Sequence, residues 1–149
     1  MRKLSIPLIA LALFTSLGFA QSKAAREVVV IKDAPPPVGP FSPAIKAGGF
    51  VFASGQLAID PATGKMIEGD IKAQTERVLK NLSAVLAAAG TGMDRAAKVT
   101  VFLKNISDFP AMNEVYTKFF PTAPPARSTV QVAGLVRDAL VEIDVVALQ

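Results

Sequence analysis

A proline-stiffened segment, Pro124-Pro125-Ala126-Arg127-Ser128-Thr129, leads into a strand pattern and places one cation at its start. By strand alternation, Arg127, Thr129 and Gln131 share one face. A guanidinium in such a place can bind a carboxylate through two parallel hydrogen bonds. From spacing alone, a solvated arginine or an ordinary ion pair is the commoner role. Arg127 is therefore a candidate carboxylate-binding residue, and a solvated or ion-paired arginine is the alternative.

The last segment of the chain carries two acids in a strand pattern. Glu142 and Asp144 alternate with Val141, Ile143 and Val145. The face that bears the acids must therefore be exposed to solvent or line a cleft. In a cleft, Glu142 could orient a water molecule for attack on an electrophilic carbon. The pattern alone favours the other interpretation, a sheet face open to solvent.

Two polar residues lie among apolar neighbours. Ser54 precedes Gly55-Gln56 at the end of an apolar strand, and Asn113 lies inside a predicted helix. Ser54 could donate a hydrogen bond to a ligand, or it could bond the nearby backbone. Asn113 could line a pocket, bind a neighbouring chain, or be an ordinary amide of the helix surface.

The composition excludes several classes of chemistry. The chain has no histidine and no cysteine, so it has no imidazole base, no thiol nucleophile and no imidazole or thiolate metal site. No group of carboxylates has the spacing of a calcium loop. Acid–base work then falls to Asp, Glu, Lys or Tyr. We expect chemistry without a metal, based on a carboxylate.

The first 20 residues have the pattern of a secretory signal peptide. A basic start, Met1-Arg2-Lys3, precedes an apolar run from Leu4 to Phe19, and Gly18-Phe19-Ala20 ends on small residues before Gln21. A retained anchor or a buried helix is the alternative, but the run is shorter than the roughly 20 residues of a membrane span and contains Pro7. We expect cleavage near Gln21, a periplasmic or secreted protein, and no membrane association after cleavage.

Residues 21–149 then form a single domain of low net charge. Without Arg2 and Lys3, the 16 basic residues of the chain fall to 14 against 12 acidic ones, and the net charge falls from +4 to +2. Nucleic-acid binding needs a concentrated basic face, so we expect no nucleic-acid partner.

The apolar periodicity predicts an α+β domain, a mixed sheet with two helices on one face. The predicted strands are 26–32, a hairpin of 44–46 and 49–54, 98–104, 127–133 and 141–148, and the predicted helices are 70–89 and 108–120. Four prolines between residues 33 and 40 exclude a helix there. Val146 and Leu148 point away from Val145 and Ala147, so both faces of the last strand are apolar. We expect subunit association to cover the second face.

Taken together, these segments resemble the RidA (YjgF) family of reactive-intermediate deaminases. The resemblance is carried by Gly39-Pro40-Phe41-Ser42, Phe52-Ala53-Ser54-Gly55-Gln56, Asn113-Glu114-Val115-Tyr116, Pro125-Ala126-Arg127-Ser128-Thr129-Val130 and Val141-Glu142-Ile143-Asp144. It implies a homotrimer around a central barrel, with three clefts between subunits. It also implies that Arg127 holds a substrate carboxylate, that Glu142 positions the hydrolytic water, and that Ser54 and Asn113 lie near the pocket.

The implied reaction converts 2-iminopropanoate or 2-iminobutanoate into the 2-keto acid and ammonia without a cofactor. Two residues of the implied substrate site depart from the family pattern: Phe41 stands where a tyrosine is common, and Thr129 where a cysteine is common. These changes bear on substrate preference and leave Arg127 and Glu142 in place. The alternative functions are a non-catalytic trimer that binds a small carboxylate and, third, an endoribonuclease.

Overall fold

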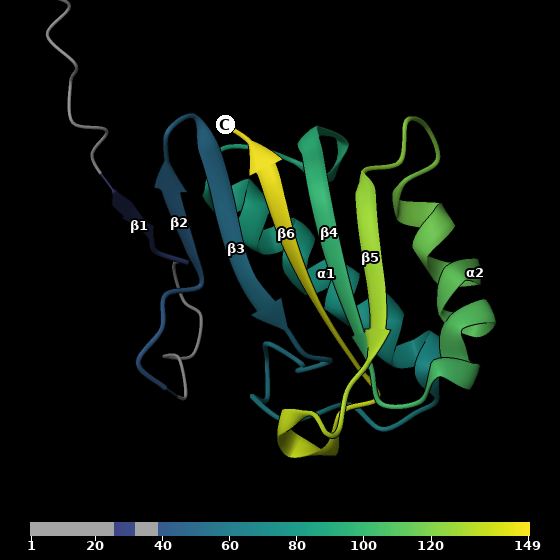
Figure 1. The fold of residues 1–149 in the computed structure, drawn as a ribbon. Coiled ribbons are helices and arrows are strands. Elements are labelled where there is room, and N and C mark those ends of the chain that lie inside the picture. Colours follow the sequence, from purple (N-terminus) through teal and green to yellow (C-terminus); the bar gives the residue numbers. More distant parts are fainter. Residues whose placement is uncertain (1–25, 32–38) are drawn as a thin grey trace, which may run out of the picture.

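The computed structural model describes residues 26–31 and 39–149. They form a six-stranded mixed sheet in the order β1-β2-β3-β6-β4-β5, with the helices α1 (Ile71–Ala88) and α2 (Phe109–Phe119) on one face (Figure 1). The predicted α+β class is therefore confirmed. The predicted signal peptide, residues 1–20, lies outside the described residues. Within the described residues, no helix has the length and apolar character needed to cross a membrane.

Four strands make the centre of the sheet and two short strands extend one side. The strands are β1 (Glu27–Val29), β2 (Ala44–Ala47), β3 (Phe50–Gln56), β4 (Ala96–Leu103), β5 (Ala126–Gln131) and β6 (Val141–Leu148). All neighbours are antiparallel except β4 and β5, which run parallel with α2 between them in the chain. Three short 3-10 turns complete the described elements: η1 (Met93–Arg95), η2 (Ile106–Asp108) and η3 (Val136–Asp138).

Two predicted strands are shorter in the structure, and in each case the partner strand explains the difference. The strand predicted for 26–32 ends at Val29, which pairs with Ala44. Pro43 stands just before Ala44 and has no N–H to continue the ladder. The strand predicted for 127–133 ends at Gln131, because its partner β4 ends at Leu103.

The helix ends follow the sequence closely. Asp70 caps α1, its Oδ1 accepting a hydrogen bond of 2.9 Å from the N–H of Ala73. Gly90 follows the helix with a positive φ of 81°, the left-handed conformation that glycine adopts most easily. Helix α2 begins with Pro110 in its first turn and is followed by Pro121.

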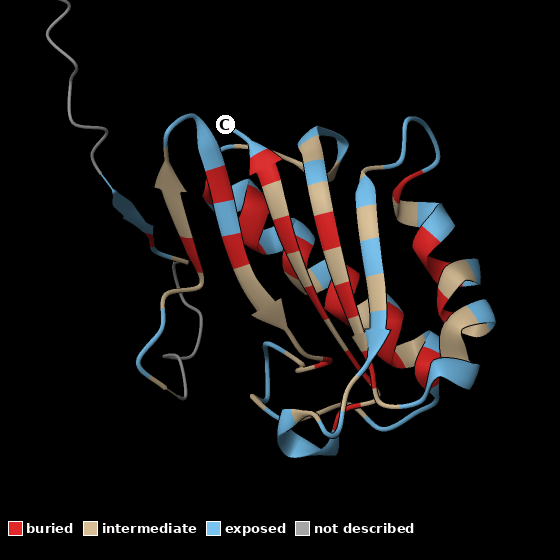
Figure 2. Cartoon of the chain, viewed as in Figure 1, coloured by how far each residue is buried: buried red, intermediate tan, exposed pale blue. Residues whose placement is uncertain are grey.

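The core lies between the helices and one face of the sheet. Alternate residues are buried along β6 and along β4 from Val99 onward, as the banding of Figure 2 shows. Leu79, Leu82 and Leu86 of α1 are fully buried against this face. Burial of each such side chain contributes roughly 1.5–3 kcal/mol to folding.

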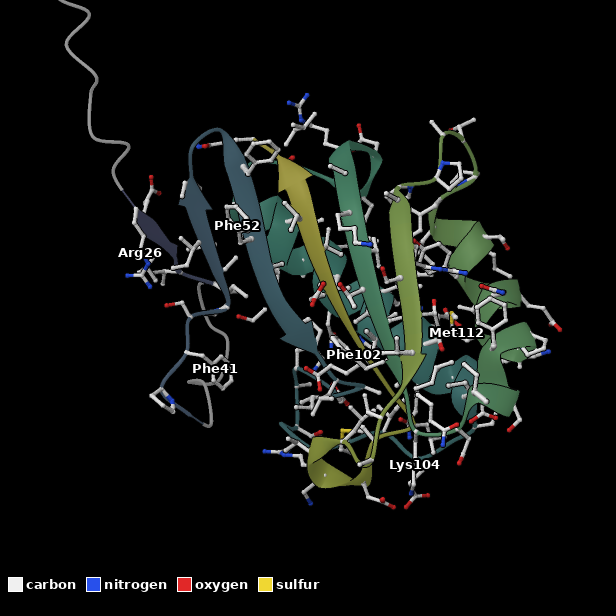
Figure 3. The ribbon with its side chains drawn as sticks, in the orientation of Figure 1. Arg26, Phe41, Phe52, Phe102, Lys104 and Met112 are labelled. Carbon is white, nitrogen blue, oxygen red and sulfur yellow. The ribbon has the colours of Figure 1, made fainter. Side chains whose placement is uncertain are left out.

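The other face of the sheet has no helix over it; we call it the open face. It carries exposed apolar side chains, including Phe52 (45% exposed) and Leu148 (44% exposed), alongside Glu142 and Asp144 (Figure 2). Phe52 and Phe102 mark this face in Figure 3. The expectation of apolar groups on both faces of the last strand is therefore confirmed.

Candidate active site

Arg127 lies on the helix side of β5, at the edge of the sheet. It pairs in register with Val99, a fully buried core residue, so its side chain points toward α2. The guanidinium carbon lies 4.4 Å from the ring centre of Tyr116 and 5.4 Å from that of Phe109. No ion pair joins the Arg127 side chain to another described residue, and its polar contact with the Tyr116 hydroxyl lacks the geometry of a full hydrogen bond. The cation is held by aromatic rings and keeps its N–H donors free.

Arg127 and Asn113 line one pocket. The pocket is open, with a volume of about 500 Å³, and is lined by Asn113, Tyr116, Thr117, Phe120, Pro124, Pro125 and Arg127. Helix α2 supplies the first three residues, and the proline segment before β5 supplies the opposite wall. We call Asn113, Tyr116 and Arg127 the arginine half-site.

Two buried hydroxyls near Arg127 have no hydrogen-bond partner within the described part of the chain. They are Oγ1 of Thr129, two residues further along β5 on the same face, and Oη of Tyr116. Burial raises the pKa of Tyr116, and the nearby charge of Arg127 opposes part of this rise. The phenol is therefore neutral and available as a donor.

Glu142 lies on the open face, on the other side of the sheet from Arg127. Its register partner in β4 is Phe102, and its neighbours along β6, Val141 and Ile143, point into the core. The carboxylate lies against the backbone of Gly55, where a Cβ atom would overlap it. Burial raises the pKa of Glu142, and the negative charge of Asp144 adds to the rise.

Ser54 belongs to the surroundings of Glu142. A register shift in β3 between Ala53 and Gln56 places Ser54 and Gly55 beside β6. The Ser54 hydroxyl donates a hydrogen bond of 2.7 Å to the carbonyl of Ser42. The Ser54 proton is therefore used in a hydrogen bond to the backbone, which was the alternative role of this residue. The hydroxyl oxygen can still accept a hydrogen bond. Phe41 is half exposed on the loop before β2 (Figure 3). We call Ser54, Gly55 and Glu142 the glutamate half-site.

One chain does not bring the two half-sites together. Arg127 shares the face of Val99 and Val145, whereas Glu142 lies on the opposite face of β6. The sheet itself stands between the guanidinium and the carboxylate. The predicted site residues therefore form two groups, Arg127, Asn113 and Thr129 on the helix side and Glu142 and Ser54 on the open side, while Phe41 lies on the loop before β2 and belongs to neither group.

The sequence did not point to two residues of these half-sites, Tyr116 and Gly55, or to Phe109 beside Arg127. Phe109 and Tyr116 have the spacing of apolar residues on an amphipathic helix, and Gly55 is only the neighbour of Ser54 in the sequence. Asn113 and Tyr116 are three residues apart on one helix, a spacing that indicates a shared face. Among residues 26–31 and 39–149, no group of three His, Cys, Asp or Glu side chains could hold a metal ion.

The chain belongs to the Endoribonuclease L-PSP (RidA) family, whose sequence profile matches residues 31–149. It is 50% identical over 122 residues to a RutC family protein of Pyrococcus horikoshii, covering 82% of this chain and 97% of the relative. It is 44% identical over 134 residues to Reactive Intermediate Deaminase A, chloroplastic, of Arabidopsis thaliana, covering 90% of this chain and 72% of the relative. The crystal structure of E. coli TdcF with bound serine has a TM-score of 0.77 at 36% identity, covering 83% of this chain and 98% of that chain. The family thus includes reactive-intermediate deaminases.

Proposed function

We propose that this protein hydrolyses small 2-imino acids, such as 2-iminopropanoate and 2-iminobutanoate, to the 2-keto acid and ammonia. The observation that carries the proposal is Arg127, a partly desolvated cation with free donors beside a pocket. A guanidinium in this state matches a carboxylate well. The relative that is named a reactive intermediate deaminase supports the reaction class. The serine bound to TdcF, an amino acid with a carboxylate, supports the size of the ligand.

Glu142 supplies the proton transfers that the reaction needs. The imine reacts in its protonated form. Water adds through its oxygen to the imine carbon while Glu142 accepts one water proton, and the C=N bonding pair becomes the lone pair of an NH2 group. Glu142 then gives this proton to that nitrogen, and the C–N bond breaks as ammonia leaves with the bonding electrons. The hydroxyl proton passes to Glu142, which releases it to solvent, and the carbonyl forms. The raised pKa of Glu142 suits both proton transfers, because such a carboxylate accepts the proton of water more readily than an ordinary glutamate and can still return it to nitrogen.

The two half-sites meet across a subunit interface in this proposal. The arginine half-site of one chain faces the glutamate half-site of its neighbour, and three such pairs close a homotrimer around a barrel. The exposed apolar side chains of the open face support the assembly, because a face of this kind becomes buried in an oligomer. Light scattering at micromolar concentration should give the mass of a trimer, whereas a stable monomer would contradict the composite site.

The deciding experiment is an ammonia-release assay with purified protein and an imino acid generated in situ. The protein should accelerate release above the spontaneous rate, and Arg127→Ala should abolish most of the acceleration. Binding of a 2-keto acid without acceleration would replace this proposal with the ligand-binding alternative. The same preparations should be incubated with RNA, because the family profile bears the name of an endoribonuclease. Cleavage that depends on Arg127 would favour that function.

Export completes the proposal. The residue types of 1–20 support a signal peptide, and the mature protein would act in the periplasm or outside the cell. N-terminal sequencing of protein recovered from the exported fraction should begin at or near Gln21. Recovery of Met1 from that fraction would contradict cleavage.

A further inference from the structure

The aromatic side chains around Arg127 do more than fill the space beside β5. Phe109 and Tyr116 are seven residues apart on α2, about two helical turns, so they present their rings on the same side of the helix. The Arg127 guanidinium lies within reach of both rings. No carboxylate or carbonyl among the described residues takes its hydrogen bonds. The rings are thus the groups that hold this cation in place.

We propose that Tyr116 is a further ligand-binding residue, whose ring fixes the orientation of Arg127 and whose hydroxyl donates a hydrogen bond to the carboxylate of the ligand. This inference rests on the proposed function and names a new residue of the same site. An aromatic face attracts a guanidinium without using its N–H groups. A carboxylate partner would hold the cation equally well, but it would occupy the donors that the ligand needs. The ring therefore orients Arg127 and leaves it able to bind.

The hydroxyl of Tyr116 supports the second part of the proposal. Tyr116 is only 5% exposed, and its Oη has no hydrogen-bond partner within the described residues. A buried hydroxyl without a partner is unfavourable, and a phenylalanine would pack in the same place without it. The residue lines the pocket with Arg127, and the Phe120 ring at a centroid distance of 4.5 Å restricts its rotation. This hydroxyl is covered in the ligand-free chain, so a ligand oxygen would satisfy the donor after a small shift of the side chains that line the pocket.

Three variants separate the ring from the hydroxyl and from general packing. Tyr116→Phe removes the hydroxyl and keeps the ring, whereas Tyr116→Leu removes both. Phe119→Leu is the matched control, because Phe119 lies on the same helix and packs against the core without a cation–π contact to Arg127. Calorimetric titration uses 2-oxobutanoate, the carboxylate product, and its uncharged amide for comparison. Light scattering and circular dichroism check that each variant keeps the assembly and fold of the parent.

We expect Tyr116→Phe to weaken 2-oxobutanoate binding about tenfold, the effect of one hydrogen bond to a charged group. Tyr116→Leu should weaken it further, to about a hundredfold, since Arg127 also loses its support. The amide should lose much less affinity in either variant, and Phe119→Leu should bind both compounds like the parent. In an Arg127→Ala background, Tyr116→Leu should weaken 2-oxobutanoate binding by a smaller factor than it does in the parent, because the Tyr116 ring acts through the arginine.

The inference is overturned if Tyr116→Leu binds 2-oxobutanoate like the parent, or if it weakens the acid and the amide equally. It is also overturned if the effect of Tyr116→Leu is undiminished in the Arg127→Ala background. Where Tyr116→Leu does not fold, Tyr116→Phe and Phe109→Leu supply the same comparison. If Arg127→Ala itself keeps the parent affinity, the carboxylate role of Arg127 fails, and the proposed function fails with it. Loss in Arg127→Ala with none in the Tyr116 variants rejects this inference alone.

Discussion

Arg127 carries a charge that no carboxylate among residues 26–31 and 39–149 pairs with, and the first prediction tests what the charge is for. Arg127→Ala should lower kcat/KM for imine hydrolysis by on the order of 100-fold or more, because the substrate carboxylate loses both of its charge-assisted hydrogen bonds. Arg127→Lys should restore little of this, since an ammonium cannot match two oxygens with a planar fork. Initial rates of ammonia release measure both variants. An Arg127→Ala protein that stays assembled and as active as the parent would contradict the role.

Glu142 and Asp144 share the open face, and their proximity predicts a pH effect. Glu142 accepts a proton only when it is ionised, so kcat/KM should rise as the pH rises through its pKa. Burial first, and the Asp144 charge second, raise this pKa above its usual value. Asp144→Asn removes the second cause and lowers the pKa, so the acid limb of the pH profile should move to lower pH. Glu142 stays buried in this variant, so the midpoint of the acid limb should remain above the pKa of a free glutamate.

The control for this shift is Glu68→Gln, which removes one negative charge from an exposed residue outside β6. Its pH profile should match that of the parent. A shift of equal size in both variants would assign the effect to net charge. A shift of the Asp144→Asn limb to higher pH would contradict the like-charge interaction between Asp144 and Glu142.

Strand β3 adapts to Glu142 by means of its irregular segment around Gly55. The φ of Gly55 is not in the left-handed region, so the glycine is required by space: a Cβ here would overlap the Glu142 carboxylate. Gly55→Ala should therefore displace Glu142 and lower kcat by about tenfold to a hundredfold, because small displacements of a catalytic group are costly. Gly134→Ala is the matched control, since no atom lies within 4 Å of the added methyl and its φ is also ordinary. Equal rates in the two variants would contradict the close fit at Gly55.

The elements themselves were largely predictable, because each has its own local signal. The apolar spacing of α1 and its cap at Asp70 set that helix, and alternation set β4 and β6. Alternation also placed Arg127 and Thr129 on one face of their strand. Alternation within one strand could not show whether Arg127 and Glu142 lie on the same face of the sheet. This depends on the parallel pairing of β5 with β4 and on the order of the strands. Strand order depends on contacts between distant residues, which leave no local pattern.

The role of Tyr116 was hidden for a related reason. In the sequence it is one more apolar position of an amphipathic helix, and burial alone explains it. Only the fold brings Arg127 over its ring, from a strand that follows the helix across a proline segment. Gly55 was hidden in the same way, because the glycine is needed by a carboxylate on another strand. Contacts between elements, rather than the elements, define these half-sites.

At the scale of the whole molecule, the sheet separates the two groups that the proposed reaction needs. Arg127 is on the helix side and Glu142 on the open side. In a ring of identical chains, each interface joins one surface of a chain to a different surface of the next. Such an interface can supply the arginine half-site from one chain and the glutamate half-site from its neighbour. Each site would then contain residues of two chains, and each chain would take part in two sites.

This arrangement predicts that two inactive variants restore activity when they share a trimer. Arg127→Ala keeps its glutamate half-site, and Glu142→Gln keeps its arginine half-site but cannot accept the proton of the attacking water. Co-expressed in equal amounts, the two chains should assort at random, and about a quarter of the interfaces should then join an intact arginine to an intact glutamate. Mixed trimers isolated through two different affinity tags exclude the two homotrimers, so each contains one intact interface in three and should hydrolyse imines at about a third of the parent rate. Each variant assembled alone should stay inactive. If mixed trimers are as inactive as the separate ones, Arg127 and Glu142 do not act across an interface, and the composite site is wrong.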